Sequence, residues 1–476
     1  MKKMNLLAMS LVSAAALSFS SCSNNDDLTS GGGSNQSKVE GFYMTFAVQT
    51  PTSNGTRTQQ QTQKVDATEA ESKVTSGTFY LVDAKGEIVF TKSITETEWT
   101  NAAPVLTTAG KAQIQVPVQN VDEGVTYKVY FLANTTDPKP WESVFTAPTG
   151  FNGGFATDKK FVMFNQNDKN SHADKYTVKF EAANKDAATP AAVSEAIMLD
   201  RVTARIDKPT SEKTTIEGTI PDGASDLQKK AIADAKDKVK TITLSKYAIT
   251  NLSNKTNIMQ QWDVTWNALQ IPKDITYIQP QADLGGKYDL QNPEYFTDAA
   301  KNYVFENTTA TPTTMYFEYT VALDETKFTD TPDCTDGTFY RYNGNIYRSI
   351  DAIYAAYADL SVLFGGKTAE ALKSELKIAE GKIGASEAEL AAFRQNYVIE
   401  VFRAGKTYYS QVIKDHWLNT NTIQRNTVYR LNVKNIFNVG ADVPNGEPDK
   451  NKPMYYLDVE VSVNPWVLST QDVELK

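Results

Sequence analysis

Two serine- and glycine-containing segments have the residue types of a catalytic or nucleotide site. Ser374 and Lys377 match the S-x-x-K spacing of a serine nucleophile, but the K-T-G and S-D-N motifs that accompany it in such enzymes are absent from the sequence. Gly365–Thr368 resembles the end of a phosphate-binding loop, yet Ser361 stands where an earlier glycine is required. We interpret both spacings as coincidence.

Acidic residues and histidines are the other candidates for chemistry. Asp330, Asp333 and Asp336 approach a calcium-loop pattern, but they are spaced by three residues instead of two, so a turn between strands explains them better. His172 and His416 have no cysteine or carboxylate at ligand spacing, which argues against a zinc site or a Ser-His-Asp triad. A glycosidase-like carboxylate pair stays open, although nothing singles one out. We predict no enzyme, no metal site and no cofactor.

The composition sets broad limits on the function. The chain has 476 residues, with 48 Lys plus Arg against 57 Asp plus Glu, a net charge of −9 and two cysteines. A nucleic-acid partner is not expected, since there is no basic surplus or basic stripe. Two cysteines cannot form a disulfide scaffold for a chain of this length. At 11% aromatic residues, with many Tyr and Phe, the composition favours strands.

The N-terminal residues have the pattern of an export signal. Lys2 and Lys3 precede an apolar run from Leu6 to Leu17, and small residues lead directly to Cys22. A cysteine in this position is the expected acceptor of a lipid, as in a palmitate-bearing bacterial lipoprotein. An ordinary secreted protein with a spare thiol there is the alternative. The polar and acidic residues after Cys22 resemble signals that send lipoproteins to the outer face of the outer membrane. Cys334 is then a lone thiol, expected in a core or strand position.

A predicted strand and an exposed loop follow a polar tether. Phe42, Met44, Phe46 and Val48 alternate with more polar residues, which indicates a strand with one apolar face. After it comes a Thr- and Gln-rich run with no apolar face, which must be an exposed and flexible loop. Arg57 is displayed in this loop, where a protease can reach it.

Strand patterns dominate the remainder. Hairpins are predicted around Ala84–Gly86 and at Asn343–Gly344, and together the strands suggest packed β-sheets. Helices are predicted near 226–239, after a Ser225 capping box, and over about 349–396, with one helix starting at the Ser386 capping box.

The C-terminal segment has a clean strand pattern. Its apolar residues alternate with polar ones and are interrupted by Asn464 and Pro465, which we expect to break the ladder because proline has no donor. A simple closing hairpin or bent edge strand is the plainest interpretation. The apolar face comprises Leu457, Val459, Val461, Val463, Val467, Val473 and Leu475.

Three segments of the sequence carry a resemblance to a known family: 43–58, 199–206 (LDRVTARI), and 405–435 leading into VEVSVNPWVLSTQDVEL. Together they resemble the fimbrillins of Bacteroidales type V pili, and most closely the shaft subunit of the minor fimbrium. In the third, the pattern of a paired-tyrosine strand followed by an R-N-x-x-Y strand is carried by Gly405, Lys406, Tyr408, Tyr409, Arg425, Asn426, Val428 and Tyr429.

The resemblance implies a mainly β protein with two tandem transthyretin-like β-sandwich domains. The implied parts are a signal peptide (1–21), a propeptide (22–57), an N-terminal domain (58–207), and a C-terminal domain (208–476) with a helical insertion and a terminal donor strand at 454–476. It also implies that an arginine-specific protease cleaves between Arg57 and Thr58 and removes the strand bearing Phe42, Met44, Phe46 and Val48.

The implied function is structural. Other copies of the chain would fill the opened groove by β-augmentation and build an adhesive pilus. The precursor would be a lipoprotein of the outer membrane, and the pilus would lie outside the cell. Implied partners are anchor and tip subunits and host or bacterial surface receptors. Alternatives are a tip or anchor subunit, or a surface glycan-binding or glycan-degrading lipoprotein that uses Trp99, Trp141 or Trp417, although packing is the simpler use of each tryptophan.

Overall fold

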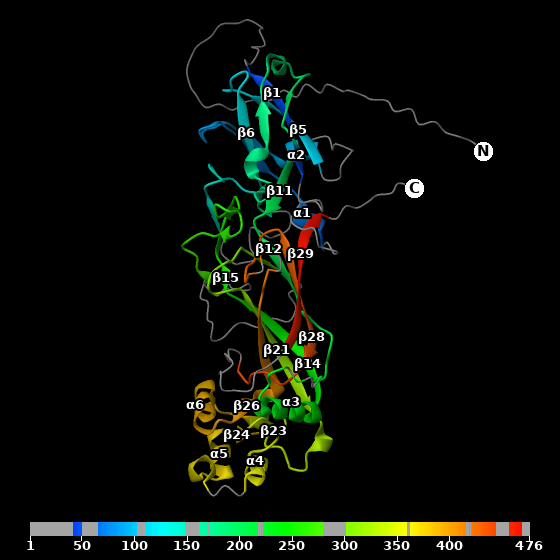
Figure 1. Ribbon diagram of the computed structural model, residues 1–476, viewed down its shortest axis with the longest axis vertical. Helices are drawn as coiled ribbons and strands as arrows, with labels where there is room; N and C mark the ends of the chain where they lie inside the picture. The colour runs from blue at the N-terminus through cyan, green and yellow to red at the C-terminus, as the bar shows by residue number, and fades with distance from the viewer. Residues whose placement is uncertain are drawn as a thin grey trace, which may run out of the picture. The chain divides into compact units, whose positions relative to one another are not determined.

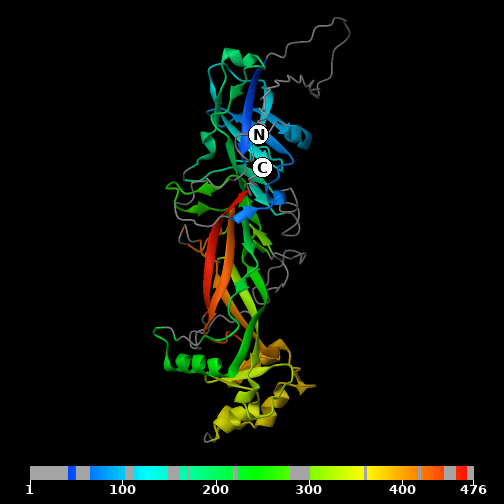
Figure 2. The ribbon, with the colours of Figure 1, turned by 90° about the vertical axis from the view of Figure 1, so that its right-hand side faces the viewer.

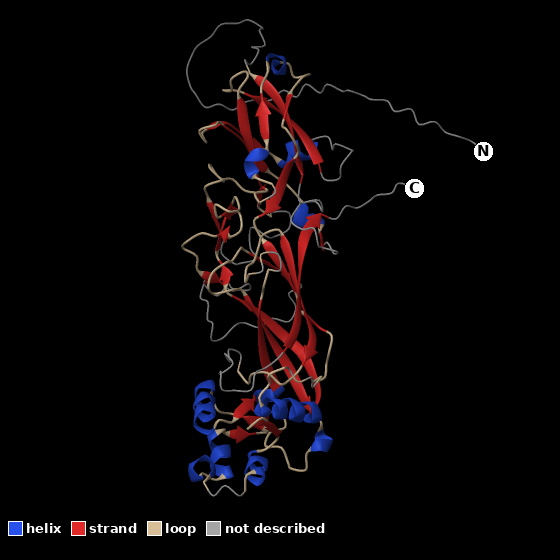
Figure 3. Ribbon diagram, viewed as in Figure 1, coloured by secondary structure: helices blue, strands red, loops and turns tan. Residues whose placement is uncertain are grey.

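The computed structural model describes most of the chain beyond Glu40, and these residues are mainly β (Figure 3), as predicted. No helix among them is long and apolar enough to cross a membrane. The described ranges are 41–49, 65–101, 111–147, 161–169, 171–217, 220, 222–278, 301–358, 362–415, 418, 420–443 and 457–468.

The first sheet contains nine strands and includes the predicted N-terminal strand (Figure 1). Its main path runs through β10 (Ala191–Ala192), β1 (Phe42–Gln49), β11 (Ile197–Arg201), β8 (Met163–Asn165), β6 (Thr126–Ala133), β3 (Gly77–Val82) and β4 (Ile88–Ile94). β5 (Lys111–Val118) pairs with β1, and β9 (Thr177–Lys179) pairs with β6. The predicted hairpin at Ala84–Gly86 joins β3 to β4.

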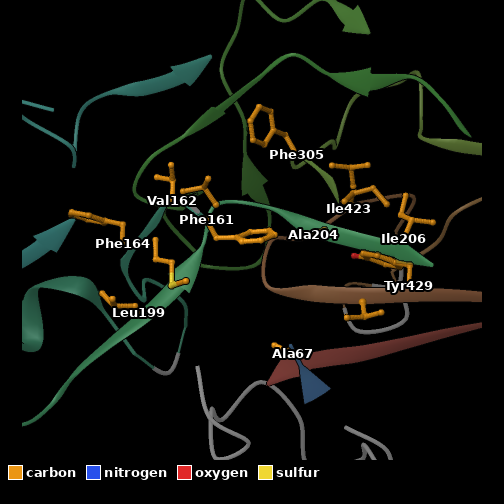
Figure 4. Close-up of a cluster of buried hydrophobic side chains, with 14 of the residues drawn as sticks. Ala67, Phe161, Val162, Phe164, Leu199, Ala204, Ile206, Phe305, Ile423 and Tyr429 are labelled. Atoms are coloured by element: carbon orange, nitrogen blue, oxygen red, sulfur yellow. The ribbon is translucent and has the colours of Figure 1, made fainter. Parts of the chain in front are cut away.

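A second sheet begins almost immediately after β11. Val202 and Thr203 separate β11 from β12 (Ala204–Asp207), which lies between β20 (Lys301–Val304) and β28 (Thr427–Ile436). Figure 4 shows core side chains on both sides of this crossing, from Phe164 and Leu199 to Ile206 and Tyr429. The path continues through β29 (Leu457–Leu468) to β2 (Val65–Ala67), and β13 (Thr210–Ser211) also pairs with β28.

A three-stranded sheet faces the second one. It contains β14 (Val239–Thr250), β21 (Thr314–Leu323) and β27 (Lys406–Val412). Asn302 of β20 donates to the Tyr247 hydroxyl of β14 at 3.0 Å, and Tyr319 of β21 donates to Ser211 of β13 at 3.0 Å. These bonds and the buried side chains of both sheets make this part a β-sandwich.

The predicted helical insertion is confirmed. A separate apolar cluster, which includes the buried Cys334, is formed by a small sheet and three helices. The sheet contains β22 (Phe339–Tyr342), β23 (Asn345–Tyr347) and β26 (Glu400–Phe402). The helices are α4 (Ile350–Ala356), α5 (Ala369–Glu375) and α6 (Glu387–Tyr397). Both predicted capping boxes are present, at Ser386 before α6 and at Ser225 before α3 (Asp226–Lys238).

Shorter elements complete the fold. β7 (Val144–Thr146) pairs with β16 (Lys255–Asn257) and so links two distant stretches of the sequence. Local pairs are β15 (Leu252–Ser253) with β19 (Tyr277–Ile278), β17 (Gln261–Trp262) with β18 (Leu269–Gln270), and β24 (Ile378–Ala379) with β25 (Lys382–Ile383). Two short helices are α1 (Glu69–Ser72) and α2 (Glu96–Asn101).

The expected break at Asn464 and Pro465 is wrong. β29 continues through both residues to Leu468, alongside β28 (Figure 2), with Pro465 in register with Thr427. A proline removes one donor from a strand, but the pairing on its other residues keeps the strand extended.

Candidate strand-exchange site

The predicted removable strand, β1, has one fully buried face. Phe42, Met44, Phe46 and Val48 are 7%, 0%, 2% and 0% exposed, whereas the alternate residues Tyr43, Thr45 and Ala47 are half-buried. This is the period-two pattern expected from the sequence. The apolar face of β1 therefore belongs to the core of the first sheet.

Aromatic side chains from other segments of the chain pack against the buried face of β1. The Phe46 ring stacks on Phe79 of β3, with centroids 4.7 Å apart, and lies 5.9 Å from Phe131 of β6. At the start of the strand, the Phe42 ring is 5.3 Å from Phe180. Removing β1 would expose these rings as a long apolar groove.

β1 is an internal strand of the sheet. It pairs with β5 along its whole length, from Phe42 opposite Val118 to Gln49 opposite Lys111. On its other side it runs parallel to β10 and then to β11. Its loss would leave backbone donors and acceptors unpaired on both sides of the groove, and any replacement must be another strand.

The described part of the predicted donor strand is β29, which lies in the second sheet. β29 pairs antiparallel with β28, from Leu457 opposite Ile436 to Pro465 opposite Thr427. Its last three residues, Trp466–Leu468, pair in parallel with β2. β2 follows β1 in the sequence, so the segment that contains Arg57 connects the removable strand to a neighbour of the terminal strand.

A buried carboxylate anchors the residues after β2. Glu71 of α1 is 1% exposed. It accepts from Arg205 at 3.2 Å, from Lys301 at 2.9 Å and from the Tyr303 hydroxyl at 2.7 Å. Burial alone would raise the pKa of the Glu71 carboxyl, but hydrogen bonds from the Thr68 backbone, Tyr303 and Lys301, with the nearby Arg205, lower this pKa to about 2. The carboxylate is ionised and fully partnered.

A buried arginine joins the same helix to the start of β28. Arg201 is 0% exposed, and its guanidinium donates to the Glu71 carbonyl at 2.7 Å, to Ser72 Oγ at 3.3 Å and to Asn426 Oδ1 at 2.8 Å. The Asn426 amide also donates to Asp200 at 3.1 Å. Burial lowers the pKa of Arg201 to about 10, against the opposing charge of Glu71. The 199–206 and 425–426 motifs thus meet in one polar network.

A second buried ion pair explains the other residues of the R-N-x-x-Y pattern. Arg425 and Glu306 side chains are each 1% exposed and lie 2.7 Å apart. The Tyr429 hydroxyl donates to Asp415 at 2.9 Å. No local sequence pattern marks Glu71 or Glu306 among the 57 acidic residues of the chain. An arginine inside an apolar strand pattern, such as Arg205, was the available signal for a buried carboxylate partner.

The remaining candidates for chemistry have structural positions. Asp333 caps α4 by accepting from the Ile350 amide at 2.7 Å, and Lys377 pairs with Glu389 at 2.6 Å. His172 stacks on Trp266, with ring centroids 4.0 Å apart, and Trp141 stacks on Tyr130 in the core. Within the described ranges, no three His, Cys, Asp or Glu residues gather as a metal site.

Several predicted site residues lie outside the described residues. The predicted lipid acceptor is Cys22, and the predicted cleavage site is Arg57 and Thr58. The others are Val473 and Leu475 of the donor pattern, His416 and Trp417.

Comparisons with known proteins point to one family. Residues 400–472 match the family model of the major fimbrial subunit protein type IV, fimbrillin, C-terminal. This match spans β26 to β29. No curated protein sequence matches the chain.

The solved structures that match this chain include the following three. A candidate cell adhesion protein from Parabacteroides distasonis is 14% identical, with 90% of this chain and 99% of that chain covered and a TM-score of 0.46. A fimbrilin from Porphyromonas gingivalis is also 14% identical over 90% and 99% of the two chains, with a TM-score of 0.42. A fimbrial assembly protein from Parabacteroides distasonis is 12% identical over 60% and 82%, with a TM-score of 0.32. The family match supports the resemblance seen in the sequence: residues 400–472 are similar to the C-terminal part of fimbrillins, the subunits of fimbriae.

Proposed function

We propose that this protein is the shaft subunit of a cell-surface pilus and polymerises by strand exchange after proteolysis. The observation that carries the proposal is the position of β1. It is an internal strand with a buried face, and its only downstream connection runs through the segment that contains Arg57. One cut there separates β1 from the rest of the protein.

The opened groove requires a new strand. Burying one large apolar side chain is worth about 1.5–3 kcal/mol, so the four buried residues of β1 contribute roughly 6–12 kcal/mol. This stabilisation can be recovered by an incoming strand with alternating apolar residues. The C-terminal segment of another copy, within 454–476, has this pattern. Donor and groove occupy different surfaces, so the contact is heterologous and extends into a filament.

The proposed life cycle places the protein at the cell surface. The precursor carries a signal peptide (1–21), a lipid on Cys22 and a propeptide (22–57), and an arginine-specific protease cleaves it at the outer membrane. The mature part forms two tandem domains, 58–207 and 208–476. Its partners are further copies of the chain, anchor and tip subunits, and surface receptors, and the pilus supports adhesion outside the cell.

Limited proteolysis tests this function. Lipid-free precursor is treated with an arginine-specific protease, the new N-terminus is sequenced, and the product is imaged by electron microscopy. We expect cleavage after Arg57 and filaments, and neither with Arg57→Ala. Clean cleavage with a product that stays monomeric would contradict a shaft role.

A further inference from the structure

β29 pairs with two strands that come from distant parts of the sequence. β28 holds it from Leu457 to Pro465, and β2 holds Trp466–Leu468. β2 comes from the part of the chain just after the proposed cleavage site. Figure 4 shows Ala67 of β2 directly beside β29, and this side chain is 4% exposed.

β2 cannot leave with the propeptide. A cut after Arg57 lies on the N-terminal side of Val65, so β2 stays on the mature chain. α1 follows directly and is fixed by the Glu71 contacts with Arg205, Lys301 and Tyr303. Arg201 ties the same turn to Asn426, the residue before β28. All of these partners lie outside β1 and survive its removal.

We propose that β2 and α1 form a clamp that remains after cleavage and keeps β29 in its own subunit as far as Leu468. Only the chain beyond Leu468 then passes to the groove of a second copy. This inference rests on the proposed strand exchange and specifies which part of the terminal segment is exchanged.

The sequence beyond Leu468 offers the groove two apolar residues at alternate positions, Val473 and Leu475. Over residues 469–475, one set of alternate positions holds Ser469, Gln471, Val473 and Leu475, and the other holds only polar residues. The first set spans the same distance along a strand as Phe42, Met44, Phe46 and Val48. The occupant to which we commit is therefore this segment of a second copy.

The pairing of β29 makes its own departure costly. Detaching β29 would remove every registered partner of β28 from Thr427 to Ile436 on that side, together with the three pairs to β2. Backbone groups along β28 would then need new partners.

A disulfide between β28 and β29 distinguishes the two routes. Arg430 and Ser462 are registered partners, and opposite residues of an antiparallel pair have Cα separations that a disulfide can span. Arg430→Cys with Ser462→Cys is oxidised, cleaved and imaged, with Ser462→Cys alone as the matched control. We expect filaments from the oxidised double variant as from the control. Filaments that appear only after reduction would overturn the clamp. Filaments in the reduced sample would show that the double variant folds, so their absence in the oxidised sample would come from the crosslink between β28 and β29.

The outcomes separate this inference from the function on which it rests. If neither the wild type nor any variant forms filaments after cleavage, the proposed function fails. If wild type and reduced variant polymerise but the oxidised variant does not, only the clamp fails.

Hydrogen exchange tests whether the clamp persists. A variant that lacks residues 469–476 is expected to stay monomeric after cleavage, and its β2 amides at 65–67 should remain as protected as in the precursor. Glu71→Ala should lose this protection. Rapid exchange of β2 in the cleaved monomer would overturn the clamp.

Discussion

β1 and α1 lie in neighbouring parts of the sequence but are stabilised by different kinds of interaction. β1 is held by an apolar face against Phe79, Phe131 and other core rings. α1 is held by Glu71 through directed bonds to Arg205, Lys301 and Tyr303.

The difference determines which element can be replaced. Apolar burial is non-directional, so another strand with the same alternation can take the place of β1. A buried charge needs partners of the right sign at the right positions, so a strand that offers only alternating apolar residues cannot replace α1. The proposed strand exchange requires β1 to leave while α1 stays, and the two kinds of contact are consistent with that requirement.

The largest effect is expected from truncating the centre of β1. Phe46→Ala should destabilise the precursor by about 3–5 kcal/mol, because it leaves a cavity beside Phe79. Filaments assembled from the same variant should be as stable as wild-type filaments, since β1 is gone. Urea denaturation of both forms measures this. Thr45→Ala, on the half-buried face, is the control, expected to cost about 0.5 kcal/mol. Equal destabilisation of precursor and filament would show that β1 is retained.

Removing the clamp carboxylate should act on both forms. Glu71→Ala removes one of the two carboxylates that pair with Arg205, and Arg205 keeps its bonds to Asp207 at 2.7 and 3.1 Å. We therefore expect a cost of about 3 kcal/mol, at the low end of the range for breaking a buried pair. The loss should appear in precursor and in filament alike, by the same denaturation measurement. Loss in the precursor alone would mean that α1 rearranges after cleavage.

Acid should weaken the clamp in a defined pH window. The folded pKa of Glu71, about 2, lies below its ordinary value of 4.5, so its contribution to stability is present above pH 4.5 and is lost as the pH falls toward 2. Glu71→Gln should remove this part of the pH dependence. The check is the difference in unfolding free energy between wild type and variant across that window. A constant difference would contradict the assignment.

The smallest effect is expected far from both elements. Ser386→Ala removes the α6 cap, in which Ser386 Oγ accepts from the Glu389 amide at 3.3 Å, and should cost about 1 kcal/mol. Ser386→Gly should lower the free energy of unfolding by only about a few tenths of a kcal/mol. Neither should change polymerisation, which is followed by sedimentation of the cleaved protein. A loss of filaments in Ser386→Ala would show that general destabilisation, and not groove or clamp, controls assembly.

The sequence predicts the features that repeat along the chain. The alternation at Phe42, Met44, Phe46 and Val48 gives β1 and its buried face correctly, because a period of two has one structural solution. The Ser225 and Ser386 capping boxes likewise predict the starts of α3 and α6.

Long-range pairing is what the sequence does not contain. Glu71 meets Lys301 and Tyr303, which lie 230 and 232 residues away in the chain, and no local pattern relates them. The short strand β2 is equally hidden, since three residues are too few for a periodic signal. Pro465 was misleading because its effect depends on whether its missing donor faces a partner.

Locking β1 in place tests strand exchange most directly. Thr45 and Gln115 are registered partners, and the Thr45 carbonyl accepts from the Val193 amide at 3.1 Å on the opposite side, so the pair is not hydrogen-bonded and its Cα atoms lie about 4.5 Å apart. Thr45→Cys with Gln115→Cys is oxidised, cleaved after Arg57 and imaged. We predict no filaments until a reductant releases β1. Filaments from the oxidised protein, with β1 still crosslinked on a non-reducing gel, would contradict polymerisation through the β1 groove.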